Sequence, residues 1–202
     1  MSRRRERGRR FVSRAGEKLD AAMDAFCLDV RGAICADFGS NVGGFTDCLL
    51  GRGAERVYAI DTGYGELAWT LRNSPRVSVM ERTNALHCPP AAQVTLVTID
   101  VAWTPQELIV PAAMRWLRPS PQGRASVVSL LKPHYELAKM TRRRPEAELT
   151  PHQADQVCLA VCRRLEDRAC TVAAAMRSPI RGKGGNIEFL LLLKTPAANR
   201  RK

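Results

Sequence analysis

Seven short apolar runs, separated by segments of helix length, constrain the fold of this chain more than any other feature. The apolar runs span residues 33–38, 56–60, 76–80, 94–99, 125–131, 170–176 and 186–194. Helical patterns lie at 44–52, 65–73, 105–117 and 151–168, and an earlier one contains Leu19, Ala22, Met23 and Phe26. Strands that alternate with helices are typical of βαβ units around a parallel sheet buried on both faces. We therefore expect one doubly wound α/β domain.

Length and composition limit the class of protein. A chain of 202 residues is the size of one domain, and 45% hydrophobic with 26% charged residues are ordinary globular values. No apolar run approaches the roughly 18 residues that span a membrane. No apolar segment follows the basic amino terminus, as a signal peptide would require. These features predict a folded protein that is neither secreted nor inserted in a membrane.

The net charge of +12 is concentrated at the two ends of the chain. Residues 1–14 hold seven arginines and one glutamate, and the chain closes on Arg200, Arg201 and Lys202, so these ends carry +9 of the excess. We expect a disordered arginine-rich arm at 1–12, a domain at 13–195 and a basic tail at 196–202. A basic run is often only a solvated surface, but this excess suggests a polyanionic partner.

Seven cysteines stand at irregular spacing, and none of them forms a CxxC pair. The three histidines do not cluster with them, so we expect no metal site. Cysteines of this kind fit buried thiols in a reducing compartment, which predicts a cytoplasmic protein.

A glycine-rich loop follows the first predicted strand, with the sequence Asp37-Phe-Gly-Ser-Asn-Val-Gly-Gly-Phe-Thr46. In open α/β sheets ligands bind at the carboxyl ends of the strands, and glycines let the backbone approach them closely. The dinucleotide fingerprint GxGxxG is broken because Asn41 occupies the place of its second glycine. The loop is therefore a candidate ligand site of another kind, with a plain tight turn as the alternative.

Two further strand ends carry polar residues. Asp61 and Thr62 follow the second strand, where an acid can bind the two hydroxyls of a ribose. Asn84 follows the third strand, where its amide could read the edge of an adenine. Each of Asp61 and Asn84 could instead be a turn residue, but an acid about twenty residues after the glycine loop favours a nucleoside ligand.

Four charged residues are placed where burial is costly. Asp100 and Lys132 end the fourth and fifth strands, Glu188 lies within the last strand, and Lys18 lies beside the apolar stripe of the first helix. Buried charges are expensive unless they are paired, so an internal ion-pair network is one explanation. Two lysines and two acids near a ligand site are also suited to the abstraction of a proton.

These motifs resemble the TlyA-type branch of the FtsJ-like ribose 2′-O-methyltransferases. The similar stretches are VSRAGEKL, DFGSNVGGFTDCLL, RVYAIDTGYGELAW, VMERTNA, the TID that ends at Asp100, LLKPHYE and GNIEFLL, and they cover nearly all of residues 11–194. The resemblance implies a Rossmann-like methyltransferase domain with a mostly parallel seven-stranded sheet whose last strand is antiparallel. It implies S-adenosylmethionine as the cofactor and RNA, typically ribosomal RNA, as the substrate.

The resemblance also assigns roles to residues. The catalytic tetrad of the family falls on Lys18, Asp100, Lys132 and Glu188. Lys132 would take the proton of a ribose 2′-hydroxyl, Lys18 would favour the neutral amine of Lys132, and the two acids would orient the lysines. The implied cofactor contacts are Asp37, Gly39, Ser40, Gly43, Gly44, Phe45, Asp61, Thr62, Asn84 and Asp100.

Two stretches depart from the family pattern. Members usually carry an S4-type RNA-binding domain before VSRxGEKL, where this sequence has only the short arginine-rich arm. The loop after LLKPHYE is usually glycine-rich, whereas here it contains Arg142, Arg143 and Arg144 before Pro145. We expect these arginines and Arg14 to contact RNA, with the arm or a delivery partner in place of the S4 domain.

Two alternatives to an RNA methyltransferase remain open at this stage. A small-molecule methyltransferase could use the same scaffold, because a fold does not define a substrate. A non-catalytic RNA- or ribosome-binding protein could keep the cofactor pocket. Some relatives are called hemolysins, but we expect no membrane role because no segment of this sequence could insert.

Overall fold

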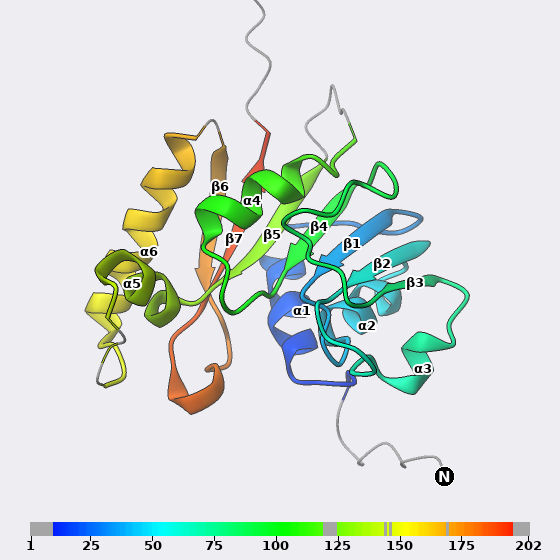
Figure 1. Cartoon of the computed structure of the whole chain (residues 1–202), viewed down its shortest axis with the longest axis horizontal. Helices are drawn as coiled ribbons and strands as arrows, with labels where there is room; N and C mark the ends of the chain where they lie inside the picture. The colour runs from blue at the N-terminus through cyan, green and yellow to red at the C-terminus, as the bar shows by residue number, and fades with distance from the viewer. Residues whose placement is uncertain (1–9, 119–124, 144, 146, 169, 196–202) are drawn as a thin grey trace, which may run out of the picture.

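The computed structural model describes residues 10–118, 125–143, 145, 147–168 and 170–195 (Figure 1). The strands in these residues are β1 (Ile34–Phe38), β2 (Arg56–Ile60), β3 (Val77–Met80), β4 (Leu96–Ile99), β5 (Ser126–Leu131), β6 (Thr171–Arg177) and β7 (Phe189–Lys194). The α-helices are α1 (Ala15–Ala25), α2 (Gly44–Gly51), α3 (Trp69–Arg72), α4 (Gln106–Met114), α5 (Pro133–Thr141) and α6 (Pro151–Glu166). A 3₁₀ turn, Lys183–Gly185, precedes β7.

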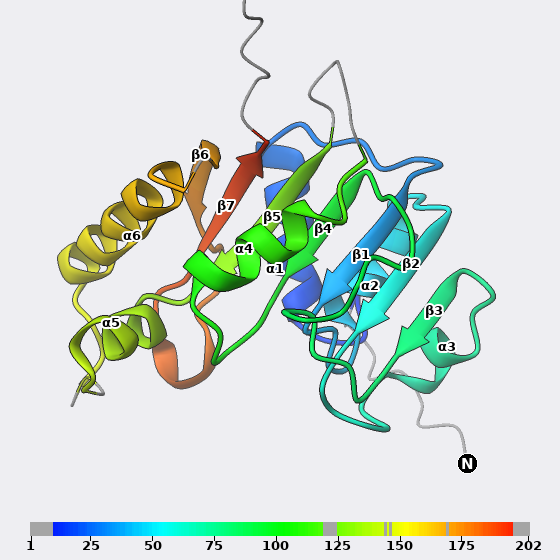
Figure 2. The ribbon, with the colours of Figure 1, turned by 45° about the horizontal axis from the view of Figure 1, so that its top comes forward.

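The strands form one sheet in the order β3-β2-β1-β4-β5-β7-β6 (Figure 2). Strands β1 to β5 pair in parallel, and β7 is antiparallel to both of its neighbours, β5 and β6. The strand order reverses between β1 and β4, whose register pairs Phe38 with Ile99. Gly39 and Asp100 therefore leave the sheet side by side. The predicted doubly wound, mostly parallel sheet with an antiparallel last strand is confirmed.

Helices cover both faces of the sheet, as Figures 1 and 2 show. Residues of α1, α2 and α3 pack on one face, and residues of α4 and α6 pack on the other, together with the partly buried apolar side chains of α5. Neighbouring residues of β7 alternate between the two cores, with Leu190 in the first and Leu191 in the second. This double burial explains why the strands are continuous apolar runs.

Two helices differ from the sequence prediction. Helix α5 was not expected, because its residues after Pro133 lack a clear apolar period; Pro133 itself lies at the start of the helix, where a missing N–H costs nothing. Helix α3 has only four residues, whereas a helix was expected over 65–73. Arg142 adopts a left-handed conformation (φ 57°) that ends α5, and Arg143 follows it. Arg144 lies outside the described residues.

Residues 10–12, which the sequence analysis placed in the arm, pack against the domain. The Phe11 ring is buried over Gly16, where a Cβ would lie 2.5 Å from the ring. The Val12 N–H donates a 2.8 Å hydrogen bond to the Asp47 carboxylate. Residues 10–12 therefore belong to the folded domain, where the Phe11 ring anchors a segment whose sequence is otherwise mostly polar. The rest of the predicted arm, 1–9, and the predicted tail, 196–202, lie outside the described residues.

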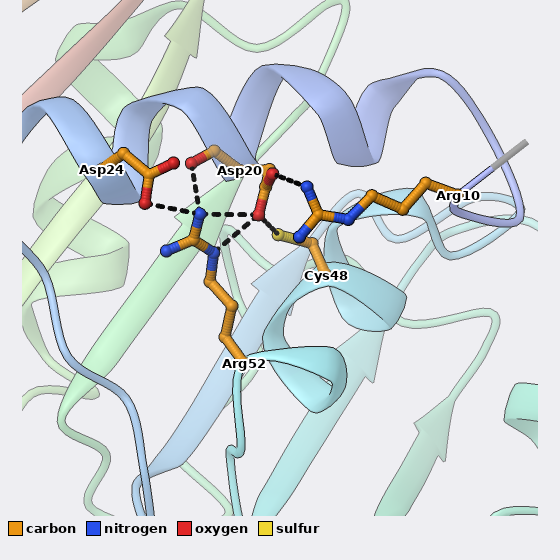
Figure 3. Close-up of polar contacts among 5 residues, drawn as sticks. All are labelled: Arg10, Asp20, Asp24, Cys48 and Arg52. Atoms are coloured by element: carbon orange, nitrogen blue, oxygen red, sulfur yellow. Dashed lines mark hydrogen bonds and ion pairs between the residues drawn. The ribbon is translucent and has the colours of Figure 1, made fainter.

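A polar network holds α1 against the end of α2 (Figure 3). One carboxylate oxygen of Asp20 lies 2.5 Å from Arg10, and the other accepts a 2.7 Å hydrogen bond from Nε of Arg52. Arg52 also lies 2.8 Å from a carboxylate oxygen of Asp24. Burial raises the pKa of the Cys48 thiol to about 12, so this group stays protonated and can donate to Asp20 at 3.9 Å. The network fixes the helix that carries Lys18.

Replacement of Asp20 should destabilise this interface more than replacement of Arg10. We expect Asp20→Ala to lower the free energy of unfolding by about 2 kcal/mol, because it removes the carboxylate oxygen that contacts both Nε and Nη2 of the partly buried Arg52 guanidinium. Arg10→Ala should cost less than about 1 kcal/mol, since the Arg10 side chain is 69% exposed. Urea unfolding of both variants tests this, and equal losses would contradict it.

Candidate active site

A cavity of about 390 Å³ opens at the carboxyl ends of the central strands. It lies between the start of α1, the loop that joins β1 to α2, the ends of β4 and β5, and the start of β7. Its lining residues are Ser13, Arg14, Ala15, Lys18, Gly39, Ser40, Asn41, Val42, Gly44, Phe45, Asp100, Ala102, Lys132 and Glu188. The cavity therefore coincides with the point at which the strand order reverses, as the fold predicts.

Glycine is required at several positions of the loop that joins β1 to α2. Gly39 has a φ of +81°, and a Cβ there would lie 2.6 Å from the Asp100 carbonyl oxygen. Gly43 has a φ of +100°, and a Cβ there would lie 2.3 Å from Leu71. At Gly44 a Cβ would meet the Ser13 hydroxyl at 2.2 Å. The glycines thus bring the loop, Asp100 and the start of α1 together around one cavity.

Asp37 is fully buried beneath this loop and does not line the cavity. Its two carboxylate oxygens accept hydrogen bonds from the hydroxyls of Thr46, at 2.7 Å, and Thr98, at 2.9 Å. Burial raises the pKa of Asp37 to about 6, against the two hydroxyl donors, which lower it. The side chain that we expected to contact the cofactor thus faces the interior, where it ties the start of α2 to β1 and β4.

Asp61, Thr62 and Asn84 lie farther along the same edge of the sheet and do not line the cavity. The Asp61 carboxylate accepts hydrogen bonds from the backbone N–H groups of Asn41, at 2.8 Å, and Gly63, at 2.7 Å. It is therefore fixed against the glycine loop while staying partly exposed. The Asn84 side-chain oxygen accepts a hydrogen bond from Leu86 N–H, as a turn residue does. Cofactor contacts of these three residues stay predictions.

The four charged residues singled out in the sequence all line the cavity, as two ion pairs. Lys18 Nζ lies 2.5 Å from Glu188 Oε2, and both side chains are less than one-tenth exposed. Lys132 Nζ lies 2.5 Å from Asp100 Oδ1 and 3.4 Å from the Val101 carbonyl oxygen. Each lysine therefore has its own carboxylate partner, and the sequence alone could not show which acid pairs with which lysine.

Other residues at the cavity were missed or given a different role. The sequence analysis did not name Ser13, Ala15, Asn41, Val42 and Ala102 as site residues, although the stretch VSRAGEKL contains the first two. Arg14, expected to contact RNA, is exposed and lines the cavity.

Arg142 and Arg143 line a different hollow, beside the cavity. The residues that the structure describes contain no group of three or more His, Cys, Asp or Glu side chains that could hold a metal ion. Among the helices of this described part, none is long and apolar enough to cross a membrane.

Comparison with known proteins first gives the class of this fold. The structure matches N-methyltransferase NodS from Bradyrhizobium japonicum WM9 with a TM-score of 0.62, over 92% of this chain and 97% of that one, at 13% identity. The sheet is thus that of the Rossmann-like methyltransferases. The model of the FtsJ-like methyltransferases matches residues 11–195. The chain belongs to the FtsJ-like methyltransferase family.

Two other proteins are much more similar to this chain than NodS is. The 16S/23S rRNA (cytidine-2′-O)-methyltransferase TlyA of Mycobacterium tuberculosis H37Rv is 40% identical over 190 residues, which cover 93% of this chain and 69% of TlyA. The crystal structure of a Lactococcus lactis protein described as a hemolysin matches with a TM-score of 0.82 at 32% identity, over 93% of this chain and 90% of that one.

The residues at the cavity fit S-adenosylmethionine, the cofactor of this family. Gly39 and Gly44 both line the cavity, and because they carry no side chain a ligand can approach the backbone of the loop closely. Asp61 is fixed beside that loop with its carboxylate partly exposed, as a ribose partner requires. Asp100 borders the same cavity and offers negative charge to a sulfonium.

The titration of Asp37 gives a test of the buried support of the loop. Because the pKa of Asp37 is raised to about 6, the folded protein holds this proton more tightly than the unfolded chain, whose aspartates titrate near 4. Its contribution to stability is full below about pH 4 and is lost as the pH rises through 6. Relative to Asp37→Asn, the wild type should lose up to about 3 kcal/mol of unfolding free energy between about pH 4 and 7. Urea unfolding across this range measures it, and parallel pH profiles would contradict it.

Proposed function

We propose that this protein transfers the methyl group of S-adenosylmethionine to a ribose 2′-hydroxyl of RNA, and that the RNA is ribosomal. The observation that carries the proposal is the pair of lysine–carboxylate contacts on one cavity beside the glycine loop. Family membership supports the reaction class, and the rRNA methyltransferase TlyA, 40% identical, supports the substrate.

Lys132 is the proton acceptor in this proposal. The cofactor supplies an electrophilic methyl group on a positively charged sulfur. As the 2′-oxygen forms its bond to that methyl carbon and the carbon–sulfur bond breaks, the hydroxyl proton passes to Lys132 Nζ, and S-adenosylhomocysteine leaves. Lys132 is suited to this role because its amine lies on the cavity and is oriented by Asp100 and the Val101 carbonyl.

Lys18 supplies a fixed positive charge at the same cavity. Its contact with the buried Glu188 fixes its position, and its positive charge can stabilise negative charge that develops on the attacking oxygen. The two pairs thus have different roles in the proposal: Glu188 positions the charge of Lys18, and Asp100 orients Lys132.

RNA is the substrate class because DNA has no 2′-hydroxyl. The exposed Arg14 at the cavity can contact a backbone phosphate close to the target ribose. A cavity with an exposed arginine at its edge and a wide basic hollow beside it favours a polymer over a small molecule.

We place this activity in the cytoplasm. All seven cysteines lie in the described residues and are free thiols, which fits a reducing compartment.

Methyl transfer by a Lys132→Ala variant tests the catalytic assignment. We expect transfer from radiolabelled S-adenosylmethionine to ribosomal RNA to fall at least about 100-fold, because the variant lacks the proton acceptor. Cofactor binding, measured by calorimetry, should be retained. Lys194→Ala, at the end of β7, is the matched control and should transfer at the wild-type rate. Equal rates for wild type and Lys132→Ala would contradict the assignment.

The arginine-rich amino terminus is proposed as a further RNA contact, which deletion of residues 2–9 tests. The deletion removes five arginines but keeps Arg10, whose ion pair with Asp20 belongs to the domain. We expect weaker binding of single-stranded RNA and a shallower salt dependence, by about 0.7 in log–log slope for each lost phosphate contact. Fluorescence anisotropy between 50 and 200 mM salt measures this, with cofactor affinity as the control. Unchanged RNA affinity at every salt concentration would contradict the proposal.

A further inference from the structure

A second hollow of about 890 Å³ opens beside the cavity and has no role in the reaction described above. We call it the groove. Its lining residues are Trp103, His134, Tyr135, Ala138, Lys139, Arg142, Arg143, Pro145, Ala147, Glu148, Gly184 and Asn186. They come from the segment after β4, from α5 and the residues that follow it, and from the segment before β7. No residue lines both the cavity and the groove.

Several residues that line the groove are close in sequence to the four charged residues of the cavity. Trp103 stands three residues after Asp100, Tyr135 stands three residues after Lys132, and Asn186 stands two residues before Glu188. Asp100, Lys132 and Glu188, three of the four charged residues of the cavity, are thus each within three residues of a residue that lines the groove. A ligand bound in the groove would therefore lie close to one bound at Lys132.

One wall of the groove is a cluster of flat rings. The ring centroids of Trp103 and Tyr135 are 5.1 Å apart, and those of His134 and Tyr135 are 4.1 Å apart. Burial and the nearby charge of Lys132 lower the pKa of His134, so the imidazole is neutral at pH 7. The Trp103 side chain stays 59% exposed although it is large and apolar. The Tyr135 side chain is partly exposed. Aromatic faces that solvent can reach stack well on nucleic-acid bases.

The rim of the groove is basic. Lys139, Arg142 and Arg143 are exposed, and Glu148 is the one carboxylate in the described lining. Within the described part of the chain, none of these three cations forms an ion pair with a carboxylate. Surfaces that bind single-stranded nucleic acid commonly combine aromatic faces with unpaired cations around them.

We propose that the groove binds the nucleotide adjacent to the methylated one, with its base stacked on Tyr135 and its phosphate against Arg142 and Arg143. This inference rests on the proposed function, because the target ribose must lie at Lys132 and the RNA chain must leave the cavity across a neighbouring surface. A base can stack there only if it is unpaired, so the groove favours a loop, bulge or other single-stranded segment. Tyr135 is then a substrate-positioning residue.

The test compares Tyr135→Ala with Tyr135→Phe, using ribosomal RNA from a strain that lacks this protein. We expect Tyr135→Ala to raise the KM for RNA about 10-fold, since the loss of one stacked base has this order of effect. Tyr135→Phe keeps the ring and should behave as the wild type. Cofactor affinity should be the same in all three proteins. A wild-type KM for Tyr135→Ala, or an equal loss in Tyr135→Phe, would overturn the inference.

A change in the RNA tests the same inference without any change to the protein. Once the methylated nucleotide is mapped, short RNAs can carry an abasic ribose on its 5′ or its 3′ side. One of the two substrates should show the 10-fold rise in KM with wild-type enzyme, and the same substrate should bind Tyr135→Ala no worse than intact RNA does. Wild-type KM values for both abasic substrates would overturn the inference.

The experiments distinguish a failure of the groove proposal from a failure of the proposed function. If wild-type protein transfers no methyl group to RNA, the proposed function fails and the groove proposal falls with it. If the wild type is active, Lys132→Ala is inactive and Tyr135→Ala has the wild-type KM, only the groove proposal fails.

Discussion

The buried contact between Lys18 and Glu188 joins the first helix to the residue before the last strand, and the active site depends on it. These residues are 170 positions apart, and neither side chain is more than one-tenth exposed. Burial of either charge alone would cost several kcal/mol, so each requires the other for the fold to close at this point. The same contact holds the Lys18 side chain on the cavity. The pair must therefore stay in contact both for the stability of the fold and for the proposed reaction.

The remaining parts of the site are arranged around this closure. The reversal of strand order places Gly39 beside Asp100, and the glycine loop then has room to lie against both β4 and α1. Asp37 supports the loop from below with its hydrogen bonds to Thr46 and Thr98. The Asp20–Arg52 contact fixes α1 two residues after Lys18. Asp37 and Asp20 therefore serve the site by positioning the loop and the helix that carry its residues.

The sheet and the four charged residues could be predicted because both follow from the cost of burial. Apolar runs of strand length must be covered on both faces, and charges within them must find partners. The pairing of Lys18 with Glu188, the inward direction of Asp37 and the groove could not be predicted, because they depend on how distant segments meet in space. Helix α5 was missed for a related reason: its apolar side chains are few, and contact with α6 rather than its own pattern stabilises it.

The identity of the methylated atom tests the account most directly. Ribosomal RNA from a strain that lacks the protein can be incubated with the enzyme and isotopically labelled S-adenosylmethionine, digested to nucleosides and analysed by mass spectrometry. The lysine–carboxylate cavity predicts that the label is found in 2′-O-methylated nucleosides. Label in base-methylated nucleosides, or no label in RNA, would contradict it.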